Sequence, residues 1–171
     1  MVLFQKKGTG IINAPIDPLT KLYYPDLVCV WELKSKDAIR YTFKKFNLEE
    51  RETEYTGLCF DYVEIIDGPH LSDRVMFGPQ CGELDAFVIK GSNKQNFFIF
   101  VTDPFEEYEG FQVEYAPYTS NCGGDLLAND QLQTLKWDYD GSNSFCQWNI
   151  KTDSHHFVHI QLWYKFSEAS R

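Results

Sequence analysis

Acidic side chains are the most prominent chemically active groups in this chain of 171 residues. Aspartate and glutamate outnumber lysine and arginine by 25 to 16, which gives a formal net charge of -9. Such a field disfavours a phosphate backbone or an anionic membrane surface, so we expect no nucleic acid partner. The carboxylates are concentrated in two runs, which predict solvated loops. These runs contain Glu49, Glu50, Glu52 and Glu54, and then Asp103, Glu106, Glu107 and Glu109.

Residues that could support catalysis do not form a known catalytic pattern. The sequence has no H-E-x-x-H and no glycine-rich phosphate loop. His70 and Ser72 share a turn without a nucleophile elbow or an oxyanion loop, so we predict an exposed turn. His155, His156 and His159 could suggest a transition-metal site, but no carboxylate or cysteine is clearly placed to join them. We predict a surface strand there and a chain that is not an enzyme.

The five cysteines stand at positions 29, 59, 81, 122 and 146, and none has C-x-x-C spacing. Disulfides in an oxidising, extracellular compartment are the better interpretation than a zinc or redox site. No apolar run approaches the roughly 20 residues of a membrane span, so we expect no membrane insertion. Residues 1–10 lack the apolar core of a secretory signal. We therefore expect an extracellular protein whose signal sequence is not present in this chain.

Short alternating stretches predict the elements that must position these residues. Aromatic residues make up 16% of the chain and alternate with polar ones, as in half-buried strands. Cys29, Trp31 and Leu33 fall on one face of one such stretch, and Ile39, Tyr41 and Phe43 on one face of the next. Residues 10–28, with three prolines, predict extended edges and turns. Further strands are expected near 62–66, 86–89, 96–101 and 111–115, which together indicate an all-β sandwich.

A polar link at 116–121 indicates a domain boundary. We predict one domain over residues 1–118 and part of a second over 119–171. The second segment alternates at Val158, Ile160 and Leu162, which predicts a strand. About 50 residues bury too little surface to complete another sandwich, so this segment is expected to be the beginning of a truncated module.

Six local strings, in one order, resemble the CUB domain, an extracellular β-sandwich module of complement proteases, tolloid-like proteases and endocytic receptors. The resemblance implies a jelly-roll-like β-sandwich of two antiparallel sheets. CGG at 122–124, with CQW at 146–148, resembles the start of a second CUB domain. The six strings are GIINAP at 10–15 followed by YP at 24–25 and CVW at 29–31, FKKFNLE at 43–49, CFDYVEIIDGP at 59–69, CG at 81–82, FVTD at 100–103 and GFQVEY at 110–115.

The resemblance also implies disulfide pairs. Cys59 would pair with Cys81, and Cys122 with Cys146, each closing a loop that adds about 3 kcal/mol of stability by restricting the unfolded chain. Cys29 would be left as a free thiol, or its partner would lie at or before the first residue and be missing from this chain.

By the same resemblance, Glu49, Asp61 and Asp103 match calcium ligands, and each follows or precedes a predicted strand. Carboxylates gathered at one end of a sandwich repel one another, and Ca2+ accepts six to eight oxygens in flexible geometry. The same three residues would also engage a lysine of a protein partner. Tyr24 matches a tyrosine of this region and is predicted to steady the Glu49 loop through its hydroxyl and to take part in partner binding.

Two departures from the family pattern affect these loops. One residue fewer than usual separates Cys59 from Asp61, and Pro104 follows Asp103 where a small polar residue is frequent. Proline keeps its carbonyl but cannot donate an amide hydrogen bond.

We therefore expect an extracellular, non-catalytic, calcium-stabilised module that binds a basic side chain of a protein partner. One alternative is a substrate-targeting region of a larger secreted metalloprotease. Another is a metal-free adhesive or glycan-binding module. A glycosidase using the loop carboxylates is the main enzymatic rival, but the sequence indicates no aromatic-lined cleft for it.

Overall fold

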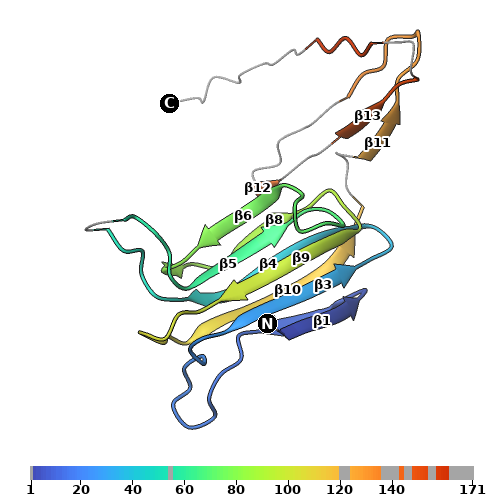
Figure 1. The fold of residues 1–171 in the computed structure, drawn as a ribbon. Helices are drawn as coiled ribbons and strands as arrows, with labels where there is room; N and C mark the ends of the chain where they lie inside the picture. The colour runs from blue at the N-terminus through green and yellow to red at the C-terminus, as the bar shows by residue number, and fades with distance from the viewer. Residues whose placement is uncertain are drawn as a thin grey trace, which may run out of the picture.

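Two β-sheets packed face to face form the main body of the chain (Figure 1). The computed structural model describes residues 2–53, 56–119, 124–135, 143–144, 148–153 and 157–161. The first sheet has the order β1-β3-β9-β5-β6 and the second the order β12-β8-β4-β10-β2, with β7 also pairing with β4. The first sheet consists of β1 (Val2–Lys7), β3 (Val28–Lys34), β9 (Gln95–Val101), β5 (Tyr62–Ile66) and β6 (Val75–Gln80). The second consists of β12 (Asn143–Ser144), β8 (Phe87–Lys90), β4 (Ala38–Asn47), β10 (Gly110–Tyr118), β2 (Gly10–Asn13) and β7 (Glu83–Leu84).

The predicted all-β sandwich is confirmed. Neighbouring strands are antiparallel in both sheets, except that β1 pairs with β3 and β12 with β8 in parallel. No helix occurs among the described residues, and so none there could cross a membrane.

Alternation places the aromatic side chains between the sheets. Cys29, Trp31 and Leu33 of β3 are buried, as are Ile39, Tyr41 and Phe43 of β4, so both predicted faces are correct. Phe98 of β9 lies at the centre, where its ring contacts rings of both sheets. Aromatic pairs of this kind add about 0.5–1.5 kcal/mol each beyond the burial of their area. The rigid core fixes the strand ends from which the loops emerge.

The N-terminal strand β1 was not predicted from the sequence. Its side chains are mostly exposed, so it lacks clear hydrophobic alternation. It is held at the sheet edge by backbone pairing to β3 and by Phe4, whose ring stacks on Trp31. The pairing of β1 with β3 joins two distant parts of the chain, and the residue pattern of β1 alone does not indicate it.

The prediction of a strand at residues 157–161 is wrong. These residues have no regular secondary structure, and Phe157 and Ile160 are exposed. Alternation favours an extended chain, but a strand also needs a neighbour, and none of the described residues pairs with this stretch. In the same segment β11 (Gly124–Leu127) and β13 (Trp148–Lys151) form a separate parallel pair. The predicted Cys122–Cys146 disulfide, His155, His156 and residues 162–166 lie outside the described residues.

Candidate metal centre

The three predicted ligands come from three loops at one end of the sandwich (Figure 1). Glu49 lies just beyond the end of β4, Asp61 directly precedes β5, and Asp103 follows β9. Tyr62 pairs with Val101, so the antiparallel β5 and β9 bring the start of one strand beside the end of the other. One carboxylate oxygen of each residue lies within 4.8 Å of the others. The structure therefore brings together the three carboxylates predicted from the sequence.

Asp61 is the buried member of the group, with no exposed surface. Its Oδ1 accepts a hydrogen bond from the backbone N–H of Asp103 at 2.7 Å, and its Oδ2 accepts one from the hydroxyl of Tyr23 at 2.5 Å. Burial raises the pKa of this carboxyl, and the two hydrogen bonds oppose the rise. Asp61 is thus held in a fixed orientation by only two donors.

The tyrosine that organises this end is Tyr23, and not Tyr24 as the sequence predicted. The Tyr23 hydroxyl accepts a hydrogen bond from the Glu49 backbone N–H at 3.2 Å while it donates to Asp61. Burial raises the pKa of Tyr23, so the hydroxyl keeps its proton. The Tyr24 side chain is 40% exposed, and its carbonyl accepts a hydrogen bond from the Thr102 hydroxyl. Adjacent side chains of an extended segment point in opposite directions, so Tyr23 points into the site and Tyr24 points away from it.

Glu49 carries the least satisfied group of the site. Its Oε2 is buried and receives no hydrogen bond from any described residue. Burial, together with the charges of Asp61, Asp103 and Glu106, raises the pKa of Glu49 to about 7. A buried oxygen that lacks a donor is costly, and a cation placed beside it would remove that cost.

The loop after β9 holds Asp103 despite the unusual proline. Asp103 Oδ1 accepts a hydrogen bond from the backbone N–H of Phe105 at 2.8 Å, so the turn closes across Pro104. The Asp103 carbonyl accepts the backbone N–H of Asp26 at 2.9 Å. The missing amide of Pro104 is therefore not needed to fix the loop.

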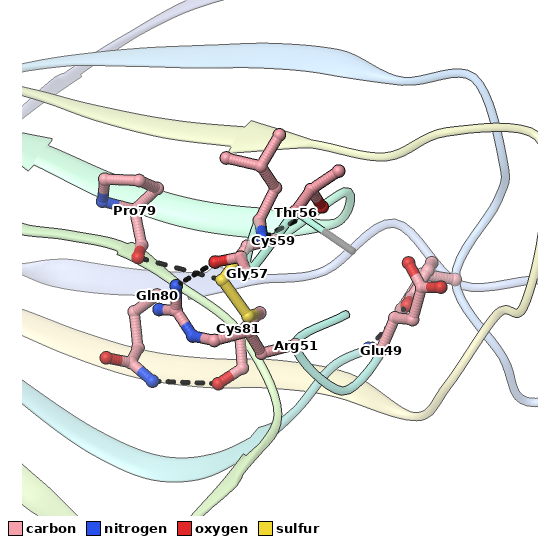
Figure 2. The surroundings of a disulfide bond; sticks show 10 residues. Glu49, Arg51, Thr56, Gly57, Cys59, Pro79, Gln80 and Cys81 are labelled. Atoms are coloured by element: carbon pink, nitrogen blue, oxygen red, sulfur yellow. Dashed lines mark hydrogen bonds between the residues drawn. A yellow bond between two sulfur atoms is a disulfide. The ribbon is translucent and has the colours of Figure 1, made fainter. Parts of the chain in front are cut away.

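A disulfide fixes the loop before Asp61 (Figure 2). Cys59 is bonded to Cys81, as the resemblance implied, and this bond ties the segment before β5 to the end of β6. Within the same loop, Arg51 donates to the carbonyl of Gly57 at 2.7 Å. The shorter spacing between Cys59 and Asp61 is accommodated without displacing Asp61 from Glu49 and Asp103.

Other residues considered from the sequence lie away from this centre. Cys29 is a buried free thiol in the core, and burial raises its pKa. His70 is in an exposed turn, where its backbone N–H donates to Asp73. Glu109 is exposed and forms an ion pair with Lys45. These are the features of a solvated loop.

A profile of the CUB domain matches residues 5–115. The chain belongs to the CUB domain family. CUB domains are protein-interaction modules of extracellular proteins, and the relatives tolloid and cubilin are extracellular or secreted.

Three named relatives are similar to this chain. The chain is 27% identical over 161 residues to the Drosophila melanogaster dorsal-ventral patterning protein tolloid, covering 90% of this chain and 14% of that protein. It is 35% identical over 113 residues to the zinc metalloproteinase nas-39 of Caenorhabditis elegans, covering 63% of this chain and 12% of that protein. It is 30% identical over 148 residues to human cubilin, covering 83% of this chain and 4% of that protein. The chain thus spans a small part of each relative.

Among solved structures, the fold resembles the MASP-1 CUB2 domain bound to Ca2+. The TM-score is 0.53 at 24% identity, with 67% of this chain and 96% of that chain covered. The human MASP-1/3 CUB1-EGF-CUB2 structure gives the same TM-score of 0.53 at 25% identity, with 67% of this chain and 40% of that chain covered. These similarities confirm the CUB fold.

Proposed function

We propose that this CUB module binds Ca2+ through Glu49, Asp61 and Asp103, and that the ordered loops then bind a lysine side chain of an extracellular protein partner. The observation that carries the proposal is the buried Oε2 of Glu49, which receives no hydrogen bond from any residue that the structure describes. One carboxylate oxygen of Glu49 also lies within 4.8 Å of an oxygen of Asp61 and of an oxygen of Asp103. The similar MASP-1 CUB2 domain is bound to Ca2+ in its crystal structure, which supports the choice of ion.

The donor set fits a hard cation. Three carboxylates supply oxygen ligands, which Ca2+ prefers, and the group contains no sulfur or imidazole. When bound, Ca2+ would neutralise the repulsion among the three side chains. Tyr23 orients Asp61 through its hydroxyl and positions the Glu49 backbone, so the chain itself aligns two of the ligands.

The exposure of each carboxylate determines whether it can contact the ion alone or the partner as well. Asp61 has no exposed surface, so its carboxylate serves the ion. Glu49 and Asp103 are partly exposed, so they can reach a partner lysine as well as the ion. Tyr24 and Phe105 are exposed on the neighbouring loops and are available to contact the aliphatic part of that lysine.

Calorimetric titration of the chelator-treated chain with CaCl2 tests the ion site. We expect one site, together with a rise in melting temperature that Glu49→Gln and Asp103→Ala each remove. Glu114→Gln is the matched control, because Glu114 is an exposed carboxylate of β10 that pairs with Lys44 outside the site. Absence of calcium binding at millimolar concentration would contradict the proposal.

The lysine contact is tested separately with a lysine-containing peptide and its norleucine counterpart. We expect the lysine peptide to bind only with Ca2+ present, and added salt to weaken the contact because exposed charges are screened. Equal binding of the two peptides would refute the lysine contact while leaving the ion site intact. A melting temperature unchanged by calcium would instead favour a metal-free adhesive or glycan-binding module.

We also propose that residues 1–118 form one module and that residues 119–171 begin a second. The family profile ends at residue 115, whereas the similarity to tolloid covers 90% of the chain and therefore extends beyond that module. Limited proteolysis should leave a fragment ending near Tyr118, where β10 ends.

The similarity to tolloid and to a zinc metalloproteinase supports a second candidate, in which the module selects substrates for a protease. The test is to join the chain to such a protease domain and compare cleavage of one protein substrate with and without Asp103→Ala. A selective role predicts a higher KM for the variant and an unchanged kcat on a short peptide.

A further inference from the structure

Part of the outer face of the first sheet is apolar, with three buried residues at its centre and three exposed ones around them. In a sandwich the outward side chains are normally polar, because they face water. Here Val30, Ile66 and Phe97 pack together on the side of the sheet opposite the core. Around them Leu3 is 56% exposed, Val28 40% and Val75 39%. We refer to these six residues and the Glu64 among them as the Glu64 face.

Strand register fixes this arrangement. Leu3 pairs with Val30, and Val30 with Ile99, so one row of apolar residues crosses β1, β3 and β9. In the next row Ile66 pairs with both Phe97 and Val75, which carries the apolar surface across β9, β5 and β6. The four strands β3, β9, β5 and β6 lie side by side in Figure 1.

Glu64 lies within this apolar surface and no described residue hydrogen bonds or ion pairs with its carboxylate. Its cross-strand neighbour on β9 is Ile99, and its neighbours on the same face of β5 are Tyr62 and Ile66. On the β6 side the backbone of Gly78 approaches the Glu64 Cα and offers no side chain. Glu64 is half-buried, and burial raises the pKa of its carboxyl.

A second glutamate on the same outer side of the sheet shows what a satisfied carboxylate looks like there. Glu32 of β3 accepts hydrogen bonds from Gln5 at 3.0 Å and Gln95 at 2.8 Å, and it pairs with Lys34 at 2.8 Å. The sheet can therefore supply donors to an outward carboxylate, but it supplies none to Glu64.

We propose that the Glu64 face docks a protein partner whose contact surface is apolar and carries one lysine or arginine directed at Glu64. Docking would bury the exposed Leu3, Val28 and Val75 and would complete the burial of Glu64. A fully buried carboxylate without a donor is costly, so the occupant must bring a cation or strong donor to that point. A second copy of this chain is disfavoured, because each copy has a net charge of -9 and would place another Glu64 face against the first.

The test uses random twelve-residue peptides displayed on phage and selected on the immobilised chain, with counter-selection on Glu64→Lys. We expect enriched peptides that carry lysine or arginine between apolar residues. As synthetic peptides they should bind at least about tenfold more weakly to Glu64→Gln and should shift the amide signals of Val30, Ile99 and Tyr62. Glu114→Gln, on the other sheet, should bind as the wild type does.

The controls separate this surface from the metal centre. Peptide binding should persist with chelator and in Asp61→Asn, because Glu64 lies on the outer sheet face and belongs to neither the loops nor the carboxylates of that centre. The proposal is overturned if no selected peptide depends on Glu64, if the enriched peptides lack a basic residue, or if sedimentation shows a dimer that Glu64→Lys disrupts.

Discussion

Two buried aspartates flank β5, and their surroundings differ. Asp67 follows the strand and Asp61 precedes it, and neither has any exposed surface. The Asp67 carboxylate accepts four hydrogen bonds, which come from the backbone and hydroxyl of Ser92, the backbone of Asn93 and the side chain of Asn96. Asp61 accepts two, and it faces the carboxylates of Glu49 and Asp103.

The difference shows that burial of a carboxylate does not by itself indicate function. The Asp67 carboxylate has four donors, and three of them fix the loop at 92–93, so Asp67 acts as a clamp for that loop. Asp61 accepts only two hydrogen bonds and faces two further carboxylates, and the proposed Ca2+ would complete its environment. The number of donors set against nearby like charges distinguishes the two.

The largest expected effect comes from removing the clamp. Asp67→Ala leaves several buried donors without an acceptor, and we expect it to lower the free energy of unfolding by roughly 3–5 kcal/mol. Urea unfolding measures the loss. Calcium should still stabilise this variant, and a loss below about 1 kcal/mol would show that the four hydrogen bonds are not the source of its stability.

Asp61→Asn, unlike Asp67→Ala, should not lower the free energy of unfolding in the absence of calcium. In chelator we expect the variant to be at least as stable as the wild type, because one of three repelling charges is removed. With Ca2+ at a hundredfold excess over its Kd, the wild type should gain about 2.7 kcal/mol and the variant almost none. Thermal unfolding with and without calcium measures both. A variant that keeps the full calcium gain would remove Asp61 from the site.

Calcium affinity should depend on pH through Glu49. Its pKa is about 7, so a proton competes with the ion below that pH. We expect roughly a tenfold loss of affinity per pH unit below 7 and little change between pH 7.5 and 8.5. Calorimetric titration over this range checks the slope. A wild-type affinity that does not change between pH 7 and pH 6 would show that Glu49 is not the group that competes with the ion.

The smallest effect concerns the two adjacent tyrosines. Tyr23→Phe removes the hydroxyl that joins Asp61 to the Glu49 backbone, and we expect a loss of about 1 kcal/mol together with weaker calcium binding. Tyr24→Phe should change stability by less than about 0.5 kcal/mol. Chemical denaturation of both variants tests the assignment, which would be reversed if Tyr24→Phe had the larger effect.

The sequence predicted those parts of the molecule that depend on alternation. Trp31, Tyr41 and Phe43 lie on the faces that their spacing indicated, because a strand with one buried face repeats every two residues. Strand β1 was missed, and a strand was wrongly predicted at residues 157–161. Both errors arise because a strand forms only where a neighbouring strand pairs with it, which the alternation of one segment does not show.

The three carboxylates of the candidate site could be predicted from the sequence, but the tyrosine that orients them could not. Glu49, Asp61 and Asp103 follow from the resemblance, and the strand ends bring them together. Tyr23 was missed in favour of Tyr24, because two tyrosines precede Pro25 and only the tertiary contacts show which one points inward. The surroundings of Glu64 could not be predicted either, because its cross-strand neighbour Ile99 comes from a distant part of the chain.

The Cys59–Cys81 bond lies only two residues from Asp61. A covalent crosslink at that point restricts the conformations of the loop in the absence of an ion. The loop would therefore lose less conformational entropy when Ca2+ binds. At the proposed site, reduction of this bond should therefore weaken Ca2+ binding even where the sandwich itself stays folded.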